Sequence, residues 1–114
     1  MTPQEHYDKA WELIREGKLD QAKRHFDEII MALKETGKDD NEESTELLAF
    51  AYRDRSHCFF DKMDIQKALM DINAACELNP EDHSIWLHMG NIYGQMAVYL
   101  RLNDIVPPAS RGGV

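Results

Sequence analysis

Hydrophobic residues recur every three or four positions along most of the chain, which places them on one face of an α-helix. No segment alternates between hydrophobic and polar positions, so we expect no β-strand. The pattern predicts an all-α fold of about five helices, the last one long and continuous, over residues 3–16, 19–36, 45–60, 65–78 and 83–104.

Local signals mark several of the expected helix ends. Thr2 and Glu5 have the spacing of a capping box, with a proline between them at the first helical position. Gly17 is placed to end the first helix, and Asp64 to cap the fourth. Pro80 disfavours helix at the residue before it and separates the fourth helix from the fifth.

Two segments lack helical periodicity. GKDDNEES, residues 37–44, is polar and predicts a loop. Residues 107–114 begin with two prolines and predict a disordered tail. One domain over residues 1–106 is therefore expected, because 114 residues are too few for two comfortable domains.

The chain contains an internal repeat. A shift of 34 residues aligns Tyr52 with Trp86 and Phe59 with Tyr93, and a shift of 46 aligns the central segment with the first. The difference of 12 residues equals the length of segment 37–48, which we interpret as an insertion. The repeats then cover residues 3–36, 49–82 and 83–106, the last of them incomplete.

WLHMGNIY at residues 86–93 resembles the first half of the tetratricopeptide repeat (TPR) signature, with methionine for leucine. The other two units resemble it at Ala10, Leu13, Gly17, Ala22, Phe26, Ser56, Phe59, Ala68, Ile72, Ala75 and Pro80. The resemblance spans residues 3–97 and implies a TPR-like superhelix of stacked helix pairs, in which Ser56 and Ala68 mark the close approach within one pair.

The resemblance also implies a concave groove that binds a peptide or helix of a partner protein. We interpret four groove residues as having no role in the core: Arg53, Asp54, His88 and Asn91. The inward faces of the first helices in the three units are expected to present Tyr7, Asp8, Trp11, Arg15, Phe50, Arg53, Asp54, His57, Phe60, Leu87, His88, Asn91 and Gln95.

One TPR subfamily binds the acidic C-terminal tails of heat-shock chaperones through lysine, asparagine and arginine side chains. The matching positions here carry none of these types, and an aspartate among them is expected to repel a carboxylate. We therefore expect an apolar or basic partner segment and not an acidic tail. The positions concerned are Tyr7, Trp11, Asp54, Ser84 and His88.

The fifth helix lacks the partner helix that would complete its repeat. Solenoids normally end in a polar cap, whereas this helix remains apolar. Two interpretations stay open. In the first, the chain is a fragment or a truncated isoform, or residues 100–106 fold back as a short helix. In the second, the exposed helix pairs with a second copy in a homodimer. The residues expected to self-associate are Tyr93, Tyr99, Leu100, Leu102 and Ile105.

Charge and cysteine content narrow the class of protein. The formal net charge of −8 argues against nucleic-acid binding, which requires a basic surface. No apolar stretch is long enough for a membrane span, and no secretion signal is recognisable at the N-terminus. Cys58 and Cys76 lie on apolar helical faces, where free thiols act as small hydrophobes. Without a secretion signal or an expected disulfide, we expect a protein of the cytoplasm or another reducing compartment.

Catalytic and metal-binding patterns are weak. His83 and His88 point apart on a helix, and His57 with Asp61 lacks a third metal ligand nearby. His57 and Cys58 are adjacent and diverge by about 100°, which does not suit a nucleophile with its base. We therefore expect no enzyme, no metal and no cofactor, and the leading hypothesis is a protein-interaction adaptor. A self-associating scaffold is the alternative.

Overall fold

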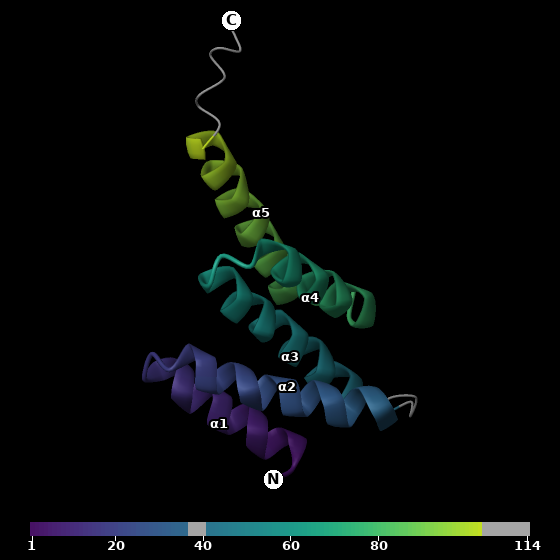
Figure 1. Ribbon diagram of the computed structural model, residues 1–114. Coiled ribbons are helices and arrows are strands. Elements are labelled where there is room, and N and C mark those ends of the chain that lie inside the picture. Colours follow the sequence, from purple (N-terminus) through teal and green to yellow (C-terminus); the bar gives the residue numbers. More distant parts are fainter. Residues whose placement is uncertain (37–40, 104–114) are drawn as a thin grey trace, which may run out of the picture.

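The computed structural model describes residues 1–36 and 41–103, and within these ranges it contains helices and no strand. The predicted all-α class is confirmed (Figure 1). The helices are α1 (Pro3–Arg15), α2 (Leu19–Thr36), α3 (Glu42–Asp61), α4 (Ile65–Leu78) and α5 (His83–Asn103).

Most helix boundaries follow from the capping residues. The Thr2 hydroxyl accepts a hydrogen bond from the Glu5 backbone at 3.1 Å, and the Glu5 carboxylate accepts from the Thr2 backbone at 2.7 Å. Gly17 follows α1 with φ of 79°, a left-handed conformation that glycine adopts without strain. Asp64 caps α4 through the backbone of Lys67.

The loop predicted over residues 37–44 is wrong at its C-terminal end, because α3 begins at Glu42. The Asn41 side chain accepts hydrogen bonds from the backbone of Glu43 and Ser44, and two glutamates in the first turn favour the helix dipole. Residues 37–40 and 104–114, which include the predicted tail, lie outside the described residues.

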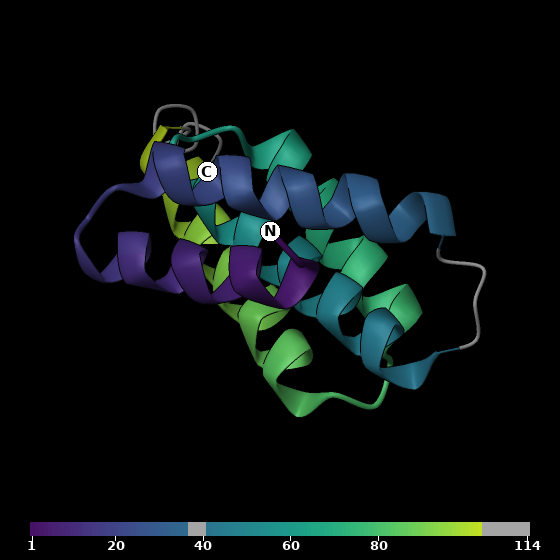
Figure 2. The ribbon, with the colours of Figure 1, turned by 90° about the horizontal axis from the view of Figure 1, so that it is seen from below.

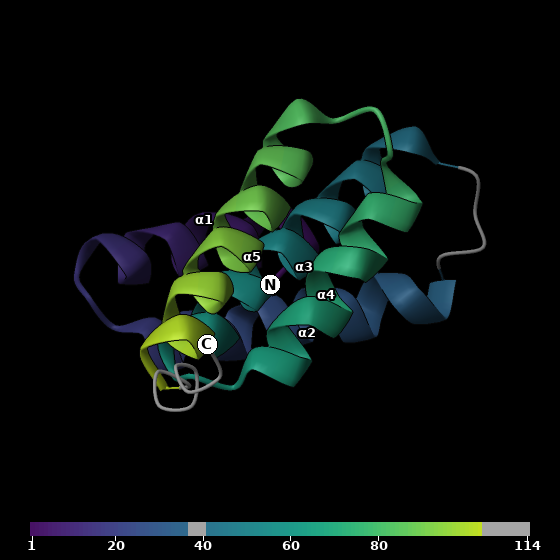
Figure 3. The same cartoon turned by 90° about the horizontal axis from the view of Figure 1, so that it is seen from above.

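The helices form an elongated stack of 55 × 30 × 21 Å. Short connections join α1 to α2 and α3 to α4, so each of these pairs folds back as a hairpin (Figures 1 and 2). α3 lies in the middle and packs against α1, α2, α4 and α5. α4 and α5 lie together over α3, as Figure 3 shows from above.

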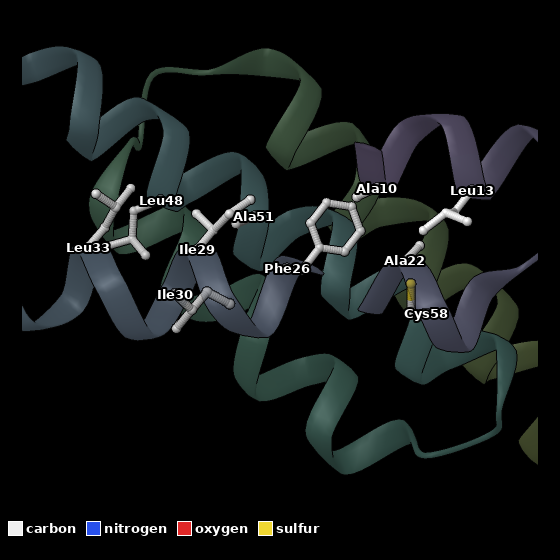
Figure 4. Close-up of a cluster of buried hydrophobic side chains, with 10 residues drawn as sticks. All are labelled: Ala10, Leu13, Ala22, Phe26, Ile29, Ile30, Leu33, Leu48, Ala51 and Cys58. Atoms are coloured by element: carbon white, nitrogen blue, oxygen red, sulfur yellow. The ribbon is translucent and has the colours of Figure 1, made fainter. Parts of the chain in front are cut away.

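Two clusters of buried side chains hold this stack together. The first joins α1, α2 and α3 around Phe26, with side chains that follow one another along α2 (Figure 4). The second joins α3, α4 and α5 around Ile72 and Ile85, both fully buried. Ser56 and Ala68 are also fully buried, which fits their expected place where the α3–α4 pair packs closely.

Candidate functional site

A network of polar side chains connects α1, α3 and α5, the first helices of the three predicted units. The Tyr7 hydroxyl donates a hydrogen bond to an Asp54 carboxylate oxygen at 2.8 Å. Arg53 donates to both oxygens of Asp54, at 2.9 and 3.2 Å, and to the Tyr7 hydroxyl at 3.3 Å. Its third nitrogen donates to the Ser84 hydroxyl on α5 at 2.8 Å. One guanidinium and one carboxylate thus fix the positions of three helices relative to one another.

The electrostatics of this network follow from burial. Asp54 is only 4% exposed, and its charge is balanced by the adjacent Arg53 guanidinium. Burial, followed by the Asp54 charge, raises the pKa of Tyr7 to about 12, so its hydroxyl remains a donor. For Arg53, burial opposes the charged form, but the hydrogen bonds and charge of Asp54 outweigh it and raise the pKa.

The interpretation that Arg53 and Asp54 have no core role is wrong. Both side chains are withdrawn from solvent and bonded to other helices, because a carboxylate buried beside α1 needs donors to offset its lost hydration. The predicted repulsion of acidic tails by Asp54 therefore loses its basis, since this charge is already paired.

Aromatic side chains surround the network. Trp11 meets Tyr7 edge-on, with ring centroids 6.4 Å apart, and the Arg53 guanidinium lies 4.7 Å from the centre of the Phe50 ring. Phe50 and Phe60 are partly buried against the second core cluster. These aromatic rings therefore support the helices and also line the surface beside them.

Two predicted groove histidines form a pair between α3 and α5. The rings of His57 and His88 meet edge-on with centroids 5.4 Å apart. His57 is exposed, whereas Nε2 of His88 is buried without a hydrogen-bond partner among the described residues. Burial, and then the proximity of His57, lowers the pKa of His88, so its ring favours the neutral form.

The other predicted groove residues are solvent-exposed. Asp8 accepts a hydrogen bond from Gln4 within α1, and Leu87 is 68% exposed on α5. These residues are accessible to a partner, but no described contact links them to one another; they are Asp8, Arg15, Leu87, Asn91 and Gln95.

An open pocket of about 630 Å³ adjoins the network at one end of the molecule. It lies where α1 begins, α2 ends and α3 begins, and Tyr7, Leu47 and Phe50 contribute to its wall. Glu43 and Glu46 also line it, and neither forms an ion pair with a described residue. Hydrophobic spacing could not reveal this pocket, because its walls come from three helices.

A second polar network was also missed, on the side of α3 that faces α2 and α4. Arg55 donates two hydrogen bonds to Asp71 at 2.7 and 2.8 Å, and a third to Asp27 at 3.0 Å. Asp71 is 5% exposed. Its spacing from Ala68 and Ala75 places it on the buried face of α4, and this signal was present in the sequence.

The expected self-association residues are only partly described. Tyr93 and Leu100 are 43% and 48% exposed on α5. The side chains of Tyr99 and Leu102, and all of Ile105, lie outside the described residues.

The described residues contain neither a cluster of potential metal ligands nor a cysteine with a lowered pKa. Within residues 1–36 and 41–103, no group of three or more potential ligand side chains is placed to hold a metal ion. Burial, followed by the charge of Asp54, raises the pKa of Cys58 to about 12, which disfavours a thiolate. None of the described helices is long and apolar enough to cross a membrane.

Comparison of the chain with models of known protein families, with curated protein sequences and with solved structures finds no match.

Proposed function

We propose that this chain is a TPR-like adaptor without catalytic activity, which binds a segment of a partner protein along the face formed by α1, α3 and α5. The proposal rests on the repeat spacing in the sequence and on the order of the helices. It applies to a reducing compartment such as the cytoplasm, where the two buried cysteines remain thiols.

The observation that carries the proposal is the hydrogen-bond network of Tyr7, Asp54, Arg53 and Ser84. It fixes three helices relative to one another, and it also leaves their neighbouring side chains exposed. A preorganised surface loses less conformational entropy when a partner binds. Such rigidity favours recognition of a partner by this surface.

The chemistry of this face favours a partner segment with apolar and basic side chains. Arg53 and Asp54 neutralise each other, so the network itself offers no strong attraction to either sign of charge. Trp11 and Phe50 supply aromatic contacts, and the adjoining pocket adds two glutamate carboxylates. An aromatic surface with acidic groups beside it suits lysine or arginine flanked by apolar residues.

The test uses two charge-matched double variants of the full chain. His57→Arg with Asn91→Arg changes exposed positions on α3 and α5, whereas Gln66→Arg with Asn73→Arg adds the same charge at exposed positions on α4. Each immobilised protein is incubated with native lysate, and captured proteins are identified by mass spectrometry. We expect the groove variant to lose partners that the wild type and the α4 variant retain.

Equal capture by all three proteins contradicts the proposed groove, and so does equal loss in both variants. Circular dichroism of each variant must match that of the wild type for the comparison to hold. Overlapping synthetic peptides that cover each captured partner are then tested for binding to the wild type. We expect the peptides that bind to be rich in basic and apolar residues.

Self-association is the second candidate function. The specific observation in its favour is the exposed apolar surface of α5, where Trp86, Tyr93 and Leu100 are each about half exposed.

A further inference from the structure

We propose that two copies of this chain pair through α5 in an antiparallel arrangement, about a two-fold axis that passes beside Tyr93. This inference does not depend on the groove, because it uses a different face of α5.

One face of α5 carries a stripe of large side chains separated by small ones. We call it the α5 stripe: Trp86, Gly90, Tyr93, Ala97 and Leu100, which follow at intervals of three and four residues. Trp86, Tyr93 and Leu100 are 50%, 43% and 48% exposed, and Gly90 and Ala97 are also exposed. A Cβ atom added at Gly90 would meet nothing within 4 Å, so no described side chain packs on the stripe at this position.

An adjacent face of α5, turned by about 100° from the stripe, already has its partners. Ile85 and Ile92 are buried in the second core cluster with residues of α3 and α4. The C-terminal half of α5 extends beyond the other helices (Figure 1), so no described helix lies beside it there. In the chain as described, the large side chains of the stripe remain about half exposed, and the Trp86 indole nitrogen donates a hydrogen bond to the Pro80 carbonyl.

The distribution of charge favours a second copy as the occupant. The chain carries a formal net charge of −8, which makes contact between identical copies unfavourable over most of the surface. Residues 83–100 contain no aspartate, glutamate, lysine or arginine. The α5 stripe is thus a surface where two copies can meet without direct repulsion between like charges.

Large and small residues of the stripe are arranged almost symmetrically on either side of Tyr93. In an antiparallel pair centred on Tyr93, Trp86 of one copy lies opposite Leu100 of the other, and Gly90 lies near Ala97. Small residues then face small residues, so the helices can approach closely on both sides of the central tyrosine. Each half of the contact buries the same set of side chains, as a two-fold axis requires.

The charges at the two ends of the helix select the antiparallel direction. Arg101 is exposed and forms no ion pair with a described residue, and Glu81 before α5 is likewise exposed and unpaired. Antiparallel pairing about Tyr93 brings Arg101 level with Ile85 of the other copy, near the end of α5 that Glu81 precedes. Parallel pairing would instead place the two Arg101 side chains together.

The decisive experiment compares two aspartate variants by sedimentation equilibrium of the full chain over about a hundredfold range of concentration. Leu100→Asp places a charge in the α5 stripe. Val98→Asp is the matched control, because Val98 is 53% exposed on the same helix but points roughly 160° away from Leu100. Each substitution acts twice in a symmetric dimer.

We expect the mass of the wild type to rise from 13.2 kDa towards twice that value, and Val98→Asp to behave in the same way. Leu100→Asp should raise the dissociation constant at least about tenfold, because it buries two unpaired charges. A wild type that stays monomeric throughout overturns the proposal; it would mean that residues 104–114 or another protein cover the stripe. Loss of the dimer in Val98→Asp alone also overturns it.

The direction of pairing is tested by mixing the single variants Gly90→Cys and Ala97→Cys under mild oxidation. Antiparallel pairing predicts mixed disulfides that join one variant to the other. Disulfides that join two copies of the same variant should be the minor products, and their dominance would contradict the antiparallel direction. The wild type provides the control, since both of its own cysteines are buried.

Discussion

The Tyr7 hydroxyl on α1 donates a 2.8 Å hydrogen bond to Asp54 on α3, and this bond joins residues 47 positions apart in the sequence. Asp54 is 4% exposed, so the donor replaces water that the carboxylate has lost. Tyr7→Phe removes the donor and keeps the ring. We expect the free energy of unfolding to fall by about 1–3 kcal/mol, because a buried charged acceptor loses a partner.

Urea denaturation followed by circular dichroism measures this change. Tyr52→Phe provides the control, since Tyr52 is a partly buried tyrosine whose hydroxyl makes no hydrogen bond with a described residue. We expect this second variant to differ from the wild type by less than about 0.5 kcal/mol. Equal effects of the two substitutions would show that the Tyr7–Asp54 bond adds nothing to stability.

The Arg55–Asp71 pair yields a second prediction. Asp71→Ala removes both hydrogen bonds of a side chain that is 5% exposed and leaves Arg55 with Asp27 alone. The free energy of unfolding should fall by about 2–4 kcal/mol, because a largely buried guanidinium loses its bidentate partner. Glu12→Ala, which removes an exposed ion pair with Lys9, should cost less than about 0.5 kcal/mol. Thermal and urea denaturation of both variants provide the comparison.

The helices were predictable from sequence because their signals are local. The capping box at Thr2 and Glu5, the glycine after α1 and the aspartate before α4 act within a few residues, and each lies where the sequence placed it. The start of α3 was misplaced for the same reason. Asn41 caps a helix within a polar stretch that has no hydrophobic periodicity, so the pattern missed the first turn.

The networks of the candidate site were not predictable in the same way. Tyr7, Arg53 and Asp54 were identified as residues of one surface, but their mutual hydrogen bonds depend on how α1 packs on α3. Hydrophobic spacing defines which face of a helix is buried and says nothing of which polar side chains meet across it. The role assigned to Asp54 was therefore wrong, because its carboxylate is buried and paired with Arg53.

Protonation of histidine gives a third prediction. Burial lowers the pKa of His88, with His57 as the next cause, and burial lowers that of His25, with His6 next. The folded chain therefore binds fewer protons than the unfolded chain, so stability rises with pH. This contribution is complete above the unfolded pKa of about 6.5 and is lost as the pH falls towards the folded values.

We therefore expect the free energy of unfolding to be lower at about pH 5 than at about pH 7. His88→Gln should reduce this slope, because it removes the partly buried ring whose pKa is lowered. Urea denaturation at several pH values measures the slope for each protein. A slope in His88→Gln equal to that of the wild type would show that His88 titrates alike in both states.

Two glycines in different backbone conformations provide the last prediction. Gly17 has φ of 79°, where a side chain is strained, and Gly94 lies within α5. An added Cβ meets nothing within 4 Å at either position, so only the backbone distinguishes them. Gly17→Ala should lower the free energy of unfolding by about 1–2 kcal/mol, and Gly94→Ala should raise it by about 0.5–1 kcal/mol because alanine favours a helix. Urea denaturation measures the free energy of unfolding of both variants. If both substitutions raise it, the turn after α1 does not require the left-handed conformation.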